Sequence, residues 1–160
     1  MAIDLFIHPG EYEFADENFC IRTTLGSCVS IVLWHRARRL GGMCHYMLPR
    51  RKRQAGQVLS GKYANEALEL MLREARKLNT RPEQYDVKLF GGGDMFPSYV
   101  SREQSVAGRN VEAGHSLIAA CGLRITAESL GGIGYRNVIF EVASGDVWVR
   151  HVKGRLVTPA

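Results

Sequence analysis

The sequence predicts an α+β fold, a layered α/β sandwich with a mixed, largely antiparallel sheet and about two main helices. One segment repeats apolar residues with the period of a helix and a second ends at a glycine typical of a helix stop, whereas shorter segments are rich in β-branched and apolar residues, as strands are. These segments do not alternate as regularly as they would in a chain of βαβ units. The length of 160 residues fits one domain, so we expect a single domain over residues 1–160.

The two expected helices are marked by their ends and by one apolar stripe. The first runs from Ser60, a residue type that caps helices, to about Leu78, and Pro82 lies beyond it. The second spans residues 110–121, with Gly122 as its C-terminal stop. The stripe of the first helix consists of Ala64, Ala67, Leu68, Met71, Ala75 and Leu78.

The expected strands are rich in apolar residues, and proline or glycine ends two of them. Residues 28–34 (CVSIVLW) are the most apolar of them, and Pro49 ends the strand that follows. Three glycines, Gly91 to Gly93, follow another strand without the Lys-Ser/Thr or GxGxxG pattern of a nucleotide loop, so we interpret them as a close backbone turn near a cleft. The full set of expected strands is 21–24, 28–34, 40–48, 86–90, 123–128, 135–142 and 147–152.

Charge and the N-terminal sequence limit the kinds of partner. The net charge of +5 permits an acidic partner, but no aromatic residues interleave with the basic run Arg50–Arg53, so nucleic acid is not expected. We interpret this run as a solvated loop, with docking onto an acidic protein surface as the alternative. The sequence lacks a signal-peptide pattern and an apolar stretch of the ~18 residues that span a bilayer, so we expect no membrane insertion and a cytoplasmic location.

Four cysteines, Cys20, Cys28, Cys44 and Cys121, are expected to be reduced, because structural disulfides are rare in the cytoplasm. They can then be core residues, metal ligands or nucleophiles. A zinc site of Cys28, Cys44, His45 and Cys121 is disfavoured, because no CxxC spacing accompanies it.

Cys28 and His45 are the candidate chemical pair. If residues 28–34 and 40–46 form a hairpin whose turn is centred between positions 36 and 37, Cys28 lies directly opposite His45. Directly opposed residues have Cβ atoms about 5 Å apart on one face, which suits a thiolate and an imidazolium. Spacing alone also permits a structural role for each, since a strand cysteine is commonly a small core residue.

The same register makes a prediction about the other face of the hairpin. Val29, Ile31, Leu33 and Cys44 would point together into the core. A bulge at the Gly41-Gly42 pair would instead place Cys44 opposite Cys28.

The residues before Cys28 are candidates for supporting roles. Gly26 permits a sharp turn, and the backbone N–H groups of Ser27 and Cys28 are candidate donors to the oxyanion of an amide hydrolase. A base is commonly oriented by a third group, for which Thr23 and Thr24 are the nearby polar candidates.

Several motifs occur together between about residues 7 and 152. They are LGSCV (25–29), GGMCHYMLP (41–49), KLFGGG (88–93), LGG (130–132), YRNVIF (135–140) and SGDV (144–147). In this order and spacing they resemble the chemoreceptor glutamine deamidases of the CheD family. The resemblance implies a layered α/β hydrolase in which Cys28 is the nucleophile, His45 its base and Thr23 the third residue, with Thr24 as the alternative.

The resemblance also implies a reaction and partners. Gln side chains of methyl-accepting chemotaxis receptors would be hydrolysed to Glu with release of ammonia, through a thioester and without a metal or organic cofactor. The receptor cytoplasmic domains would be the protein substrate, and some family members also bind a CheC-type phosphatase. The alternative function is a non-catalytic binding module that regulates such a phosphatase or the receptor.

Overall fold

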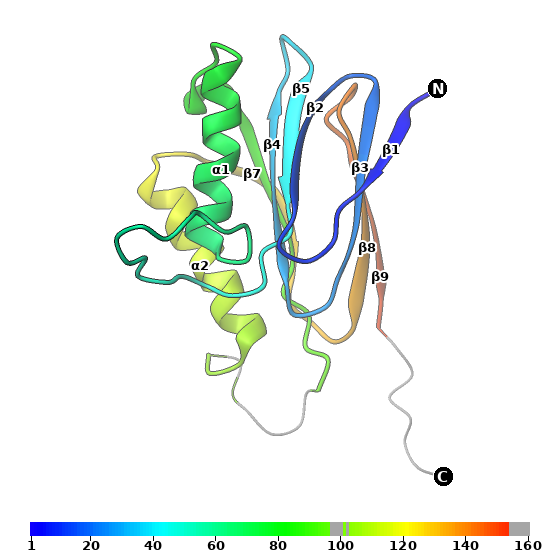
Figure 1. The fold of residues 1–160 in the computed structure, drawn as a ribbon. Coiled ribbons are helices and arrows are strands. Elements are labelled where there is room, and N and C mark those ends of the chain that lie inside the picture. Colours follow the sequence, from blue (N-terminus) through cyan, green and yellow to red (C-terminus); the bar gives the residue numbers. More distant parts are fainter. Residues whose placement is uncertain (97–100, 102, 154–160) are drawn as a thin grey trace.

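The computed structural model describes residues 1–96, 101 and 103–153, which form two stacked sheets and a layer of two helices (Figure 1). The four-stranded sheet has the order β1 (Ile3–Phe6), β3 (Phe19–Leu25), β8 (Tyr135–Glu141) and β9 (Val147–Val152). The five-stranded sheet has the order β2 (Tyr12–Asp16), β5 (Leu40–Cys44), β4 (Val29–His35), β6 (Asp86–Gly91) and β7 (Ile125–Leu130). Helices α1 (Ala64–Lys77) and α2 (Val106–Ala120) pack on the face of the five-stranded sheet that is turned away from the other sheet.

The predicted fold class is confirmed, although the strands divide into two sheets. The β1–β3 and β6–β7 pairs are parallel, and the other strand pairs are antiparallel. Strands β1 and β2 were not predicted, because they are short and mostly exposed or half-buried and therefore carry little apolar signal. A 3-10 helix, Pro82–Gln84, precedes β6. Among the described residues, no helix combines the length and apolar character that crossing a membrane requires.

Both helices differ from prediction at their starts. Helix α2 begins at Val106, four residues early, because the Ser105 Oγ accepts a hydrogen bond from the Gly108 N–H at 3.0 Å. Its predicted stop is confirmed by Gly122, which has a φ of +70°. Helix α1 begins after Tyr63 and not at Ser60. Its predicted stripe is buried from position 64 to position 75, whereas position 78 lies at the exposed end.

Strand β4 is buried along its whole length because both of its faces are covered. Val29, Ile31 and Leu33 pack with the helices, whereas Val32 and Trp34 face the four-stranded sheet. A strand covered on both sides needs no alternation of polar and apolar residues, which explains its nearly continuous apolar sequence.

Strands β4 and β5 form the predicted hairpin, but the predicted register is wrong by two residues. Val32 pairs with Met43, and an isolated bridge joins Val29 to Tyr46. The turn therefore occupies positions 36–39 and is centred one position later than predicted, with Arg39 in the left-handed region at a φ of 49°.

A shift of two residues preserves the predicted faces, because side chains along a strand alternate with a period of two. Cys44 accordingly lies with Ile31 in the core cluster below the helices, as predicted. Cys28 packs against the cluster between the two sheets.

Two adjacent glycines in β5 allow aromatic rings to approach the strand closely. A Cβ on Gly41 would lie 2.6 Å from the Phe140 ring and 2.6 Å from the Leu33 carbonyl oxygen. A Cβ on Gly42 would lie 2.5 Å from the Phe14 ring. The glycines pair in register with β4, so the alternative of a bulge at this point is wrong.

We expect Gly41→Ala to destabilise the fold by about 1–3 kcal/mol, the usual cost of overpacking a core. Thermal or urea unfolding followed by circular dichroism measures the change. The double variant Gly41→Ala/Phe140→Leu should be less unstable than the sum of the single variants, because the smaller side chain relieves one of the two clashes. Wild-type stability of Gly41→Ala would contradict this explanation.

Candidate active site

Thr23 and His45 come from different sheets and meet in the interior. Thr23 lies in β3 of the four-stranded sheet, and His45 directly follows β5 of the five-stranded sheet. Both are buried, with exposed fractions of 2% and 3%. The Thr23 Oγ1 lies 2.7 Å from the His45 Nδ1 and 2.8 Å from the carbonyl oxygen of Ile7.

These two contacts assign the protonation of the imidazole ring. The Ile7 carbonyl can only accept, so the Thr23 hydroxyl donates its single hydrogen to Ile7. The Thr23 oxygen is then an acceptor for His45, which places the ring proton on Nδ1. The Nε2 of His45 is consequently unprotonated, the form that can take a proton from a thiol.

The segment between β1 and β2 also holds the backbone of His45. The His45 N–H donates to the Glu11 carbonyl at 3.0 Å, and the Gly10 N–H donates to the His45 carbonyl at 2.8 Å. Ile7, which accepts from Thr23, belongs to the same segment. The position and the tautomer of His45 therefore depend on one short segment of the chain.

Cys28 lies in the turn between β3 and β4, and the predicted glycine turn fixes this segment. The Gly92 N–H donates to the Cys28 carbonyl at 2.8 Å, and the Gly93 N–H donates to the Gly26 carbonyl at 2.9 Å. Gly92 has a φ of +63°, a conformation that favours glycine. These contacts confirm that the three glycines form a close backbone turn, and they place it against the cysteine.

Cys28 and His45 share a face of the sheet but are diagonal neighbours. Continuing the β4–β5 register by one residue beyond Val29 places Cys28 opposite Met47, two residues from His45. Diagonal neighbours have Cα atoms about 7–8 Å apart, with Cβ atoms somewhat closer. Within the described part of the chain, the Cys28 Sγ makes no hydrogen bond to His45. Contacts between a nucleophile and its base commonly tighten when substrate binds, so this geometry is compatible with a reactive pair.

Burial shifts the pKa of the two groups in opposite directions. It raises the pKa of the Cys28 thiol, an effect that a hydrogen bond from the Ser27 side chain partly offsets. It lowers the pKa of His45 to about 4, and the nearby His8 has a smaller effect in the same direction. At neutral pH the structure therefore favours a thiol beside a neutral imidazole over the thiolate–imidazolium pair expected from the sequence.

An open cavity of about 420 Å³ lies beside the Cys28 segment. Its walls are Ser27, residues 93–96 and residues 104–107 at the start of α2. Met95 and Phe96 are 44% and 86% exposed, so the wall presents apolar side chains to solvent. Ser27 connects this cavity to the cysteine turn, whereas Cys28 and His45 do not line it.

The alternative third residue, Thr24, does not reach His45. Its hydroxyl donates to the Asn137 Oδ1 at 2.8 Å, and Thr24 is exposed. Successive residues of a strand point to opposite faces, so only one of the two threonines can face the imidazole.

The residues considered for zinc are not gathered at one place. Cys44 lies in the core on the helix side of the five-stranded sheet, and Cys121 is exposed at the end of α2. In the described ranges, no three His, Cys, Asp or Glu side chains are placed to hold a metal ion.

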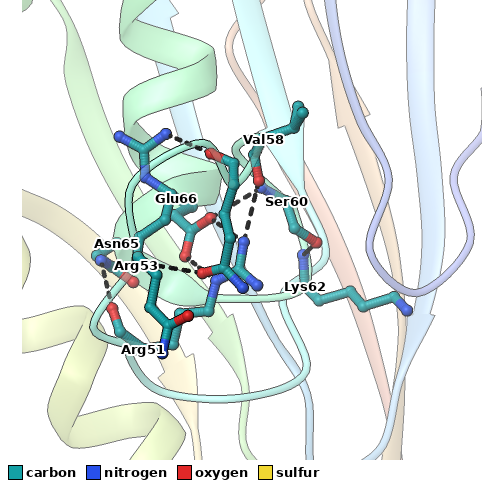
Figure 2. Close-up of polar contacts among 9 residues, drawn as sticks. Arg51, Arg53, Val58, Ser60, Lys62, Asn65 and Glu66 are labelled. Atoms are coloured by element: carbon teal, nitrogen blue, oxygen red, sulfur yellow. Dashed lines mark hydrogen bonds and ion pairs between the residues drawn. The ribbon is translucent and has the colours of Figure 1, made fainter.

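The basic run Arg50–Arg53 is partly built into the segment that precedes α1 (Figure 2). The Arg51 Nε and Nη2 donate to the two carboxylate oxygens of Glu66 at 2.8 and 2.9 Å. Glu66 is 2% exposed and also accepts from the Ser60 N–H at 3.0 Å. The interpretation of a solvated run is therefore wrong for Arg51, which stabilises the fold and is not free to dock onto a partner.

Comparison with known proteins places this chain in a family. A family model described as "CheD chemotactic sensory transduction" matches residues 47–151. A "Probable chemoreceptor glutamine deamidase CheD 3" of Dechloromonas aromatica is 44% identical over 151 residues, which cover 94% of this chain and 89% of that protein. A "Probable chemoreceptor glutamine deamidase CheD" of Pseudomonas savastanoi pv. phaseolicola is 48% identical over 92% of this chain and 84% of that protein. A protein of the same name in Thermococcus kodakarensis is 36% identical over 94% of each chain.

The fold and the site define a layered α/β protein with a buried Thr–His pair beside a cysteine turn. The chain belongs to the CheD family, as the sequence motifs predicted.

We expect the His45 ring to be the Nδ1–H tautomer and to gain its second proton only near pH 4. Long-range ¹H–¹⁵N NMR correlations of the ring nitrogens, recorded as a function of pH, measure both properties. Thr23→Val keeps the side-chain shape but removes the acceptor, so it should lose the tautomer preference. A wild-type titration near the ordinary value of about 6.5 would contradict the effect of burial.

Proposed function

We propose that this chain is a protein-glutamine deamidase that converts specific Gln side chains of chemoreceptor cytoplasmic domains to Glu with release of ammonia. The observation that carries the proposal is the buried Thr23–His45 hydrogen bond, which leaves the His45 Nε2 unprotonated on the face that also holds Cys28. The relatives' names supply the substrate class. In this proposal the chain is a single domain over residues 1–160, acts in the cytoplasm and needs no metal or organic cofactor.

The first half of the reaction forms a thioester. The Cys28 Sγ attacks the side-chain amide carbon of glutamine while its proton passes to the His45 Nε2. The tetrahedral intermediate collapses when the C–N bond breaks, and the same proton goes from His45 to the leaving nitrogen, which departs as ammonia. Thr23 keeps the proton on Nδ1 throughout, so that Nε2 serves as both base and acid.

The second half hydrolyses the thioester. His45 takes a proton from water, whose oxygen attacks the thioester carbon, and the C–S bond then breaks. The proton returns to the sulfur, so Cys28 is again a thiol and the product side chain is Glu. Because burial keeps both resting groups neutral, charge develops only during attack, where the backbone N–H groups of Ser27 and Cys28 can stabilise the oxyanion.

We expect purified chain to release ammonia from a receptor cytoplasmic fragment, with amide-to-acid mass changes at specific glutamines. Cys28→Ala and His45→Ala should abolish the reaction, and Thr23→Val should lower kcat about 10- to 100-fold through loss of the correct tautomer. Ammonia assays and peptide mass spectrometry measure these effects.

Neighbouring residues provide matched controls for these variants. Thr24→Val removes the next hydroxyl, which faces away from His45, and Cys44→Ala removes a cysteine on the other face of the sheet. Both should retain catalysis when folded. No ammonia from wild type with several receptors would refute the proposal and favour the binding module that regulates a CheC-type phosphatase or a receptor.

A further inference from the structure

Asn110 of α2 joins the segment that carries Cys28 to the segment that carries His45. Its Nδ2 donates to the Ser27 carbonyl at 3.0 Å and to the Met47 carbonyl at 2.9 Å. Ser27 directly precedes the cysteine, and Met47 lies two residues after the histidine. Asn110 is 0% exposed, so solvent does not compete for these bonds.

The two contacts also assign the orientation of the Asn110 amide. An amide nitrogen has two hydrogens, one for each carbonyl, whereas the oxygen in that place would face two acceptors. The Oδ1 is buried, and no partner for it is found among the described residues. A buried acceptor without a partner costs free energy. We therefore attribute the fixed orientation of the Asn110 amide to the two hydrogen bonds that its nitrogen donates.

The main chain of Asn110 strengthens the same connection. The Tyr46 hydroxyl donates to the Asn110 carbonyl at 2.5 Å, and Tyr46 is fully buried beside His45. Asn110 therefore attaches helix α2 to the segment that follows His45 through both its backbone and its side chain. It attaches the helix to the cysteine turn through its side chain alone.

The bond to Ser27 orients the peptide group that enters Cys28. In a trans peptide the C=O of one residue and the N–H of the next point in opposite directions. Since the Ser27 C=O points to Asn110, the Cys28 N–H points away from the Asn110 amide. This N–H donates no hydrogen bond to the described residues, so its single hydrogen has no competing acceptor among them.

We infer that Asn110 is a positioning residue that aims the Cys28 N–H at the oxyanion of the tetrahedral intermediate, an inference that rests on the proposed deamidase function. Asn110 touches neither the substrate nor the reacting atoms. It acts by holding the Ser27–Cys28 peptide, while its bond to Met47 keeps that peptide at a constant place relative to the His45 segment.

The test compares deamidation with alkylation of the same cysteine in Asn110→Leu, which keeps the side-chain size but removes both donors. Loss of one oxyanion donor costs about 10²- to 10³-fold in kcat, and because the N–H is misaligned and not deleted, we expect a loss of about 10- to 100-fold. KM should be unchanged. Alkylation of Cys28 by iodoacetamide displaces iodide without forming an oxyanion, so its rate should stay close to that of wild type.

Asn65→Leu is the matched control. Asn65 lies in α1, donates from Nδ2 to the Arg51 carbonyl at 3.5 Å, and has the same unpartnered buried Oδ1. It should retain wild-type kcat. If Asn110→Leu does not fold, Asn110→Ala serves instead, because it removes both donors without adding bulk or a buried charge.

Three results would overturn the inference. Wild-type kcat in the Asn110 variant would overturn it while leaving the deamidase proposal intact. An equal fall of kcat and alkylation rate would show a general distortion of the site. Absence of ammonia release from the wild-type protein would refute the deamidase proposal itself, and this inference with it.

Discussion

The Thr23 hydroxyl donates its single hydrogen to the Ile7 carbonyl, and this constraint places the ring proton of neutral His45 on Nδ1. The contact joins the two sheets, because Thr23 belongs to one and His45 follows a strand of the other. It forms only if the sheets stack correctly, and the apolar cluster between them, which includes Ile21 and Met43, secures that stacking. The chemistry of the site therefore depends on long-range packing more than on any local motif.

Burial has a cost and a benefit for such a site. It keeps His45 uncharged at neutral pH, so that the imidazole can accept a proton, but it also raises the pKa of the Cys28 thiol and leaves no preformed thiolate. Charge must then develop during attack, which makes the placement of oxyanion donors important. The cysteine turn is restrained accordingly, since its carbonyls accept hydrogen bonds from Gly92, Gly93 and Asn110.

The sequence predicted the face that Cys28 and His45 share better than it predicted the register of their hairpin. Cys28 and His45 were placed on one face although the hairpin register was wrong by two, because an even shift does not change the face. The choice between Thr23 and Thr24 needed the second sheet, whose stacking leaves no local signal. Asn110 could not be found, since a single Asn in a helix has no pattern and its partners lie 83 and 63 residues away.

The central claim is that Cys28 and His45 act as one thiol–imidazole pair, and the pH dependence of Cys28 alkylation tests it most directly. Peptide mass spectrometry would follow iodoacetamide labelling of wild type and His45→Gln, with the exposed Cys121 as reference for the reagent. The account predicts that the wild-type labelling rate reaches a plateau once His45 loses its proton at a pH of about 4. The plateau ends where the pH approaches the raised pKa of Cys28, and it is absent in His45→Gln. A labelling rate that rises in proportion to hydroxide in both proteins would contradict it.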